Sequence, residues 1–216
     1  MKIWLAEFIG TFALVFVGVG AIASGADGLA VAFAFGLTVA VMIAAVGGIS
    51  FAHFNPAVTV GFFVLGRINF LQLLLYWSAE FLGAMAAILL LHFFYGTERL
   101  GAVNYGVTQL TPDVSPFIGV GIEAVLTFFL FFVIASCVLQ QHPQPGLYIG
   151  FTVTLCAIAG GALTGASMNP ARSFAPALAA NDWTHHWVYW VGPILGASVA
   201  ALTARFIWRD KAYNRK

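Results

Sequence analysis

The chain carries one tripeptide twice, within the stretches AHFNPAVT at residues 52–59 and TGASMNPARS at residues 164–173. The two copies, Asn55-Pro56-Ala57 and Asn169-Pro170-Ala171, lie 114 positions apart. Asn is a favoured N-cap residue, and Pro is tolerated at the first helical position because its missing N–H would have no partner there. Each tripeptide is therefore expected to begin a helix.

The segments around the two tripeptides, residues 48–66 and 161–180, fit neither a full membrane crossing nor an ordinary loop. Both are polar and Gly-rich at their start and apolar afterwards. About eleven helical residues, each rising about 1.5 Å, give roughly 16 Å, which is half the thickness of a bilayer. The sequence therefore predicts two re-entrant half-helices.

The composition indicates a surface that faces lipid. Of the 216 residues, 61% are hydrophobic and 8% are charged, and the mean hydropathy is +0.94. Soluble domains carry about 25% charged residues. No Asp, Glu, Lys or Arg lies between Asp27 and Arg67 or between Glu123 and Arg172. With a net charge of +1 and no basic stripe, the chain offers nothing that would attract nucleic acid.

Six other segments are apolar and long enough to cross a membrane. They are residues 3–23, 29–47, 70–94, 117–139, 147–163 and 186–207. Six crossings place both termini on one side of the membrane. Apart from Arg172, the basic residues on that side are Lys2, Arg67, Arg205, Arg209, Lys211, Arg215 and Lys216, whereas the other side has Arg99. The positive-inside rule therefore predicts that both termini are cytoplasmic, and we expect an integral protein of the cell (inner) membrane.

The second half of the chain repeats the first. Besides the tripeptides, Glu7–Thr11 matches Glu123–Thr127, and Gly83-Ala84 matches Gly196-Ala197. Each half holds three crossings and one half-helix. Because three is an odd number, the second half is expected to be inserted upside down relative to the first.

The repeats, roughly residues 1–97 and 115–210, predict a single transmembrane domain over residues 1–216. The expected fold class is an all-α membrane protein with six transmembrane helices plus two re-entrant half-helices in an inverted repeat. Non-helical backbone at membrane depth is tolerated only where it is buried in protein or lines a water-filled cavity. We therefore expect the two half-helices to meet near the midplane and to present Asn55 and Asn169 to a shared lumen.

From end to end, the chain resembles the aquaporins, or major intrinsic proteins. The resemblance rests on Ala6-Glu7-Phe8 and on residues 52–59 and 164–173. One Asn-Pro-Ala would be a weak signal, but two in equivalent places of an inverted duplication, with Arg172 after the second, are highly specific. The resemblance implies that residues 1–216 form a passive channel in the lipid bilayer for water and small uncharged solutes, which excludes protons and ions. It also implies a homotetramer with a pore in each subunit, no cofactor, no metal and no enzymatic activity.

The resemblance further implies how the pore works. Both half-helices point their positive N-terminal ends at the midplane, and Asn55 and Asn169 donate hydrogen bonds to passing water, which is the known physics of this family. In the resembling family, glutamates at the positions of Glu7 and Glu123 bond the backbone of the re-entrant loops. An ionised group in an apolar helix is costly and needs such partners. The alternative, that both are neutral and merely packed carboxylic acids, stays open.

Four positions form the outer constriction that the resemblance implies: Phe35, Ala157, Ala166 and Arg172. Strict water channels usually have His at the position of Ala157 and often Cys or Thr at that of Ala166. Two alanines therefore imply a selectivity filter that is wider and less polar than theirs.

The range of solutes stays open between two readings. Ser173, where glycerol facilitators have Asp, and Tyr189-Trp190, where they often have Pro-Leu, are typical of water channels. Residues 164–173, however, are also similar to plant nodulin-26-like channels, which carry metalloids and small polyols. The alternative is thus a channel mainly for larger neutral solutes, such as glycerol, metalloid acids such as arsenite, or ammonia.

Other functions fit the sequence less well. A coupled secondary transporter shares inverted repeats, but it would usually need ionisable groups that line the site for its coupling ion. A membrane enzyme would need several titratable groups in one lumen, and the sequence places no cluster of such groups with His53. Two residues have no assigned role: Glu80, which is expected to face a symmetry axis or a lumen, and Phe51, which stands where relatives usually have Gly.

Overall fold

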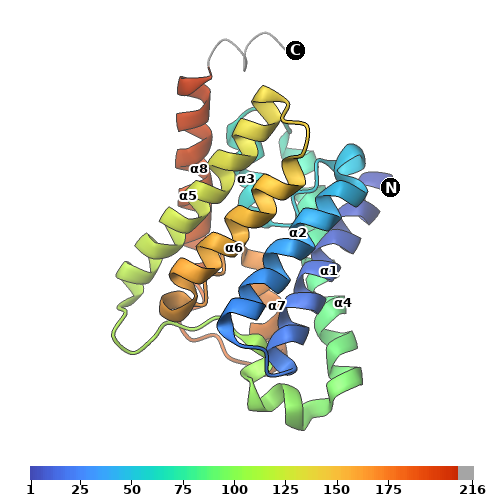
Figure 1. Ribbon diagram of the computed structural model, residues 1–216, viewed down its shortest axis with the longest axis vertical. Coiled ribbons are helices and arrows are strands. Elements are labelled where there is room, and N and C mark those ends of the chain that lie inside the picture. The colour runs from blue at the N-terminus through green and yellow to red at the C-terminus, as the bar shows by residue number, and fades with distance from the viewer. Residues whose placement is uncertain (209–216) are drawn as a thin grey trace.

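The computed structural model describes residues 1–208, and this part of the chain is built from helices without strands (Figure 1). The helices are α1 (Lys2–Ala23), α2 (Gly28–Ser50), α3 (Pro56–Val64), α4 (Phe70–Ala102), the 3-10 turn η1 (Asn104–Gly106), α5 (Pro116–Gln140), α6 (Pro145–Thr164), α7 (Pro170–Ala180) and α8 (Val188–Ile207). Six of them are long and apolar enough to cross a membrane, and the two short ones, α3 and α7, begin at the prolines of the repeated tripeptide. The expected fold class is confirmed.

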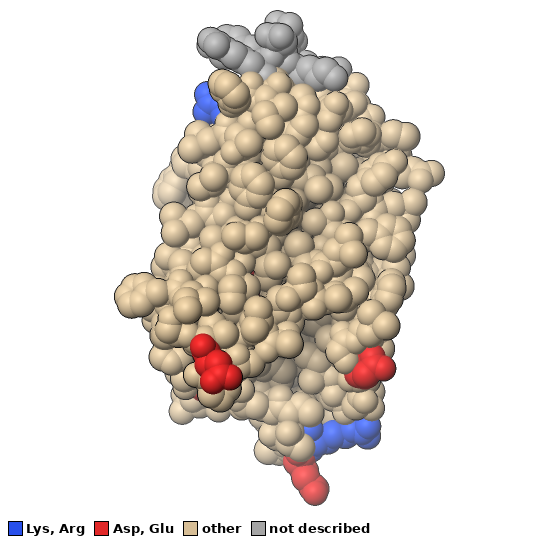
Figure 2. All heavy atoms as spheres, turned by 60° about the vertical axis from the view of Figure 1, so that its left-hand side comes forward, with Lys and Arg blue, Asp and Glu red and all other residues tan. Residues whose placement is uncertain are grey.

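Charged side chains are sparse on the face in Figure 2 and lie toward its two ends, so that a broad uncharged band separates them. Large apolar side chains on the outside, such as Phe93 and Phe117, are more than four-fifths exposed, as contact with lipid permits. The start of α1 and the end of α8 lie at the same end of the bundle (Figure 1), as six crossings require. Four of the basic residues assigned to that side lie outside the described residues, namely Arg209, Lys211, Arg215 and Lys216.

The helix α4 extends beyond the crossing that its apolar run predicts. The expected segment ends at residue 94, whereas α4 continues to Ala102. Gly96 interrupts it with φ 74° and ψ 170°, a backbone conformation that Gly adopts without steric cost. The apolar run therefore marks the straight crossing, and a further short helical piece follows the break.

Equivalent glycines let equivalent helices approach closely in the two halves. A Cβ on Gly83 of α4 would lie 2.4 Å from the carbonyl oxygen of Phe8 in α1, and one on Gly196 of α8 would lie 2.1 Å from that of Ala124 in α5. Any larger residue at these positions would push the paired helices apart. The pairs α1–α4 and α5–α8 are thus two copies of one packing unit, which explains why the Gly-Ala dipeptide is repeated.

The pair α2–α6 joins the two halves. A Cβ on Gly36 of α2 would lie 2.5 Å from the carbonyl oxygen of Gly150 in α6, and a Cβ on Gly150 would lie 2.5 Å from that of Gly36. The two glycines are 114 positions apart, like the two asparagines. This reciprocal contact shows that a pseudo-two-fold axis relates the halves.

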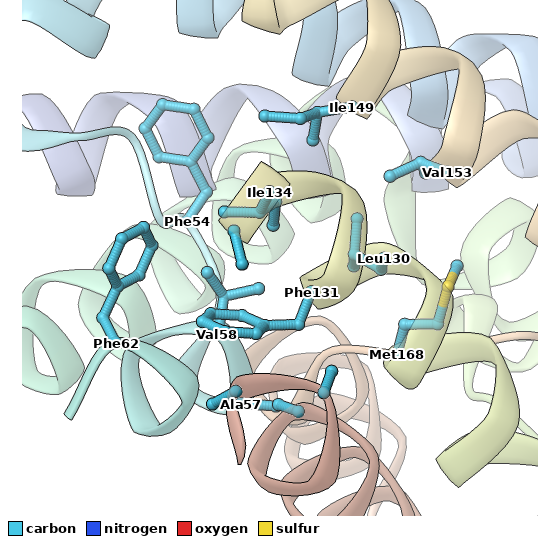
Figure 3. Packing of buried hydrophobic residues seen from close by; sticks show 14 of the residues in the cluster. Phe54, Ala57, Val58, Phe62, Leu130, Phe131, Ile134, Ile149, Val153 and Met168 are labelled. Carbon is cyan, nitrogen blue, oxygen red and sulfur yellow. The ribbon is translucent and has the colours of Figure 1, made fainter. Parts of the chain in front are cut away.

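The first half-helix is anchored inside the bundle by aromatic packing. Figure 3 shows Val58 and Phe62 of α3 beside Phe131 of α5. The rings of Phe62 and Phe131 meet edge to face, with centroids 5.4 Å apart and an interplanar angle of 83°. A Cβ on Gly61 would lie 2.3 Å from the ring of Phe131, so the helix backbone rests directly on that ring. This packing fixes the position of the polar end of α3.

Candidate functional site

Asn55 and Asn169 cap the two half-helices. Each has extended backbone, with φ of −161° and −149°, and stands directly before the first helical residue. The Oδ1 atom of Asn55 accepts a hydrogen bond from the N–H of Ala57 at 2.9 Å, and that of Asn169 accepts one from Ala171 at 3.0 Å. Because capping commits each amide oxygen to its own helix, the NH2 group of each side chain is left to reach elsewhere.

Each asparagine also binds the loop of the other half. The Nδ2 atom of Asn55 donates to the carbonyl oxygen of Met168 at 2.7 Å, and that of Asn169 donates to the carbonyl oxygen of Phe54 at 2.8 Å. An amide NH2 carries two N–H donors, so each side chain keeps one beyond this link. Sequence reasoning missed the link, although the equal spacing of the repeats is the signal that points to a reciprocal contact.

Glu7 and Glu123 bind the backbone of the two loops, and both are fully buried. The two oxygens of Glu7 accept from the N–H groups of the two residues before Asn55, at 3.0 and 2.7 Å. The two oxygens of Glu123 accept from the N–H groups of the two residues before Asn169, at 2.9 and 2.7 Å. One carboxyl group in each half therefore satisfies two buried backbone donors that no helix can satisfy.

These loops contain strained backbone. Ala52 and Phe54 have φ of 53° and 52°, and the equivalent Ala166 and Met168 have φ of 43° and 52°. The left-handed region costs a non-Gly residue about 1–2 kcal/mol. Hydrogen bonds to the glutamates and from the opposite asparagine hold this geometry in place.

Glu80 of α4 adds a carboxyl group to the first loop. Its Oε1 accepts from the N–H of Asn55 at 3.2 Å and from the hydroxyl of Thr59 at 2.7 Å. That hydroxyl also lies 2.9 Å from Nδ1 of His53. Glu80 is fully buried, so the expectation that it faces a symmetry axis or a lumen is wrong. The physical reason is that α3 packs against α4 and brings polar groups of its first turn to this carboxyl group.

One cavity of about 590 Å³ lies between the two halves of the molecule. Asn55 and Asn169 are both on its wall. The wall also includes the four candidate filter residues, Phe35 of α2, Ala157 of α6, Ala166 of the second loop and Arg172 of α7. Residues from four separate segments thus share one cavity.

Arg172 is the charged side chain of this cavity, and it is only 5% exposed. Its guanidinium carbon lies 5.0 Å from the centre of the Phe35 ring, and its Nη1 donates to the carbonyl oxygen of Gly106 at 2.8 Å. A guanidinium has five N–H donors, so N–H groups beyond the one bound to Gly106 are available to a solute in the cavity. Because burying a charge is costly without partners, these contacts account for a cation at this depth.

The connection between α4 and α5 contributes residues that sequence reasoning did not single out. Gly106 and Thr108 lie on the cavity wall, and the hydroxyl of Thr108 lies 2.7 Å from that of Ser173. The Ser173 hydroxyl in turn lies 2.6 Å from that of Ser167 in the second loop. The connection carries neither a repeat nor a motif, so no signal in the sequence pointed to it.

Phe51 ends α2 with left-handed backbone, at φ 67° and ψ −1°. The equivalent position at the end of α6 is Gly165, at φ 80° and ψ 2°. Phe51 therefore occupies a position that favours Gly, and its side chain is two-thirds exposed. The loop keeps the same path in both halves despite the larger residue.

Comparisons with known proteins agree with this architecture. The family model described as major intrinsic protein matches residues 1–204. Aquaporin TIP4-1 of Zea mays is 44% identical over 212 residues, which cover 91% of this chain and 81% of the relative. The lens fiber major intrinsic protein of Oryctolagus cuniculus is 41% identical over 210 residues, which cover 94% of this chain and 79% of the relative.

A solved structure shares the fold. The aquaglyceroporin from Plasmodium falciparum superimposes with a TM-score of 0.86, covering 97% of this chain and 98% of that one, at 24% identity. Together with the family match over nearly the whole chain, these likenesses establish what kind of protein this is. The chain belongs to the major intrinsic protein family, the aquaporins, and it is an integral membrane channel for water and small solutes, not an enzyme.

Proposed function

We propose that water and small uncharged solutes pass through the 590 Å³ cavity between Asn55 and Asn169, and that one ring of side chains selects them. The observation that carries the proposal is that both asparagines and all four ring positions line one cavity between the two halves. The ring consists of Phe35, Ala157, Ala166 and Arg172.

The asparagine pair would act as two fixed donors. Each amide has an N–H group beyond the one that binds the opposite loop, and each sits at the N-terminus of a half-helix. A water molecule that accepts from Asn55 and Asn169 directs its own hydrogens away from them, which interrupts a chain of proton transfers. The positive ends of α3 and α7 repel cations at the same point.

The ring would set the size and polarity of the solutes. Arg172 offers N–H donors and repels cations, and Phe35 supplies an apolar wall. Ala157 and Ala166 add little volume to the ring. This observation favours a channel that passes water together with some larger neutral solute, such as glycerol, arsenous acid or ammonia.

Glu7 and Glu123 would brace the loops through the hydrogen bonds described above, which argues against a role as packed acids without partners. We further propose one domain over residues 1–216 with repeats at about 1–97 and 115–210, a homotetramer with a pore in each subunit, and cytoplasmic termini in the cell membrane. Family membership supports the oligomer, and the shared end of α1 and α8 supports the orientation.

The test is osmotic and solute flux in proteoliposomes, for the wild type and for Asn55→Asp and Asn169→Asp. A carboxylate removes the donor and cancels the positive potential, so each variant should lose water flux or admit cations. The wild type should conduct down a gradient of either sign without dependence on an ion, unlike a coupled transporter. Folded Asp variants with unchanged water flux and no cation leak would place the pathway elsewhere.

A further inference from the structure

The carbonyl that holds Arg172 belongs to a strained segment. Gly106 accepts from Arg172 at 2.8 Å, and it follows Asn104 and Tyr105 in the connection between α4 and α5. These three consecutive residues have φ of 46°, 54° and 72°. Because two of them are not Gly, this conformation persists only where the surroundings hold it.

Asp182 accepts hydrogen bonds from two side chains of the α4–α5 connection, one on each side of Gly106. Its Oδ2 atom accepts from Nδ2 of Asn104 at 2.8 Å and from Nε2 of Gln109 at 2.9 Å. Its Oδ1 atom accepts from the N–H of Thr184 at 3.1 Å. The hydrogen bond from Asn104, together with the others, holds the pKa of Asp182 below its usual range, so the acceptor stays charged at neutral pH. Hydrogen bonds to a charged acceptor are stronger than those between neutral groups.

Asp182 is also fixed to α7, the half-helix that carries Arg172. It lies two residues beyond the end of α7, and its N–H donates to the carbonyl oxygen of Ala177 at 3.0 Å. A third tie, between the hydroxyls of Thr108 and Ser173, spans 2.7 Å nearer the start of α7. The segment 104–109 is thus attached along α7 at both ends, with the Gly106 carbonyl facing Arg172 between the attachments.

We propose that Asp182 is a positioning residue for the selectivity filter: by clamping Asn104 and Gln109 it fixes the Gly106 carbonyl, and through it the guanidinium of Arg172. Asp182 is not on the cavity wall, so it reaches the solute only through this chain of contacts. The inference rests on the proposed filter role of Arg172, and the experiment is arranged to separate the two.

The experiment compares the wild type with Asp182→Ala, Asp113→Ala and Arg172→Val in proteoliposomes, using the water-to-glycerol permeability ratio and proton leak. Asp113 is the matched control because it is exposed, lies on the same α4–α5 connection and makes no side-chain hydrogen bond with any described residue. Asp182→Ala should lower the ratio by about threefold or more, the usual size of an effect transmitted through contacts. It should also raise proton leak toward that of Arg172→Val, whereas Asp113→Ala should match the wild type.

Two further variants test the clamp itself. Asp182→Asn keeps an oxygen that can accept from both amides, so it should retain most of the selectivity. The double variant Asn104→Ala with Gln109→Ala removes the donors instead of the acceptor, and it should show the same loss of selectivity as Asp182→Ala. It therefore tests the clamp even where Asp182→Ala folds poorly. In both disrupted proteins, hydrogen exchange should quicken in residues 103–110.

Three results would be decisive against parts of this account. If Arg172→Val alters selectivity while Asp182→Ala and the double variant do not, Asp182 does not position the filter. If Asp113→Ala matches Asp182→Ala, surface charge and not the clamp is responsible. If Arg172→Val itself changes nothing, the filter role of Arg172 fails first, whatever Asp182 does.

Discussion

The two re-entrant loops, residues 50–59 and 164–173, are held by the same hydrogen bonds but carry different side chains toward the cavity. Each loop is held by one glutamate and capped by one asparagine that binds the opposite loop. In each, a tyrosine hydroxyl donates to the carbonyl at the end of the preceding helix, Tyr76 to Ser50 and Tyr189 to Thr164. Duplication has therefore preserved the bonds that fix the backbone.

The displayed side chains diverge around the cavity. The positions 114 residues from the four filter candidates are Ile149, Ile43, Ala52 and Val58. All four line the same cavity. The four filter candidates thus include an arginine, whereas the four equivalent positions are all apolar, with Val58 at the position of Arg172. The two halves therefore share the backbone arrangement that brings both sets of positions to the cavity, and they differ in the side chains at those positions.

The polar groups behind the loops differ as well. In the first loop, His53 stacks between Phe62 and Tyr76, with ring centroids 4.2 Å away on each side, and the Thr59 hydroxyl joins it to Glu80. In the second loop, hydroxyls take the equivalent places, since the Ser173 hydroxyl bonds those of both Ser167 and Thr108. The first loop therefore depends on two carboxyl groups and the second on one.

The largest expected effect follows from this difference. Glu123→Ala leaves two buried N–H groups and the hydroxyl of Thr164 without their acceptor. Each such loss costs about 1–3 kcal/mol, so the free energy of unfolding should fall by about 3 kcal/mol or more. Glu7→Ala also frees two N–H groups and the hydroxyl of Ser50, but Glu80 still accepts from the first loop, so its loss should be smaller. Thermal unfolding of the purified variants measures both, and a larger loss for Glu7→Ala would contradict the comparison.

The next largest effect is expected for Arg172→Val. This variant places at position 172 the same residue type as Val58, the equivalent position in the first half. Water flux should persist while protons or small cations begin to leak, since the repelling charge is gone. Proton flux into pH-sensitive proteoliposomes measures the leak. Arg99→Val is the control, because Arg99 is basic but off the cavity wall, and it should stay proton-tight. If the Arg172→Val variant shows no proton leak and unchanged permeability to every solute, Arg172 does not belong to the constriction.

The smallest expected effect concerns the helix ends before the loops. Phe51→Gly relieves left-handed strain of about 1–2 kcal/mol but makes the unfolded chain more flexible, for a net gain of about 0.5–1 kcal/mol. Gly165→Ala should destabilise, because its φ is +80° and a Cβ would lie 3.1 Å from Thr108. Melting temperatures should thus move in opposite directions. Phe51→Ala keeps a Cβ at positive φ, so it should show no gain, and a gain equal to that of Phe51→Gly would rule out backbone strain.

Local signals allowed much of this structure to be predicted. The start of each half-helix could be placed at Pro56 and Pro170 because capping by Asn and the tolerance for Pro act within a few residues. The six crossings follow from apolar length, and the inverted arrangement follows from three crossings in each repeat. The filter positions came from the resemblance, and the structure places them on one cavity wall.

The parts that could not be predicted join distant residues without a repeated pattern. The contact between Arg172 and Gly106 spans 66 positions, and that between Asn104 and Asp182 spans 78. Glu80 breaks the repeat, since the equivalent position in α8 is Pro193. Symmetry therefore gave no counterpart from which its buried contacts with the first loop could be inferred.

The proposed filter is tested best by the water-to-glycerol permeability ratio of Ala157→His, measured by stopped flow in proteoliposomes beside the wild type. An imidazole at this position should project toward Phe35 and Arg172, narrow the ring and offer water a polar contact. The control is Ala159→His on the same helix, because Ala159 is exposed and off the cavity wall. We expect the wild type to pass water with some glycerol, Ala157→His to keep water but lose most glycerol flux, and Ala159→His to change neither. A wild type impermeable to every solute larger than water, or a folded Ala157→His protein with an unaltered ratio, would contradict this expectation.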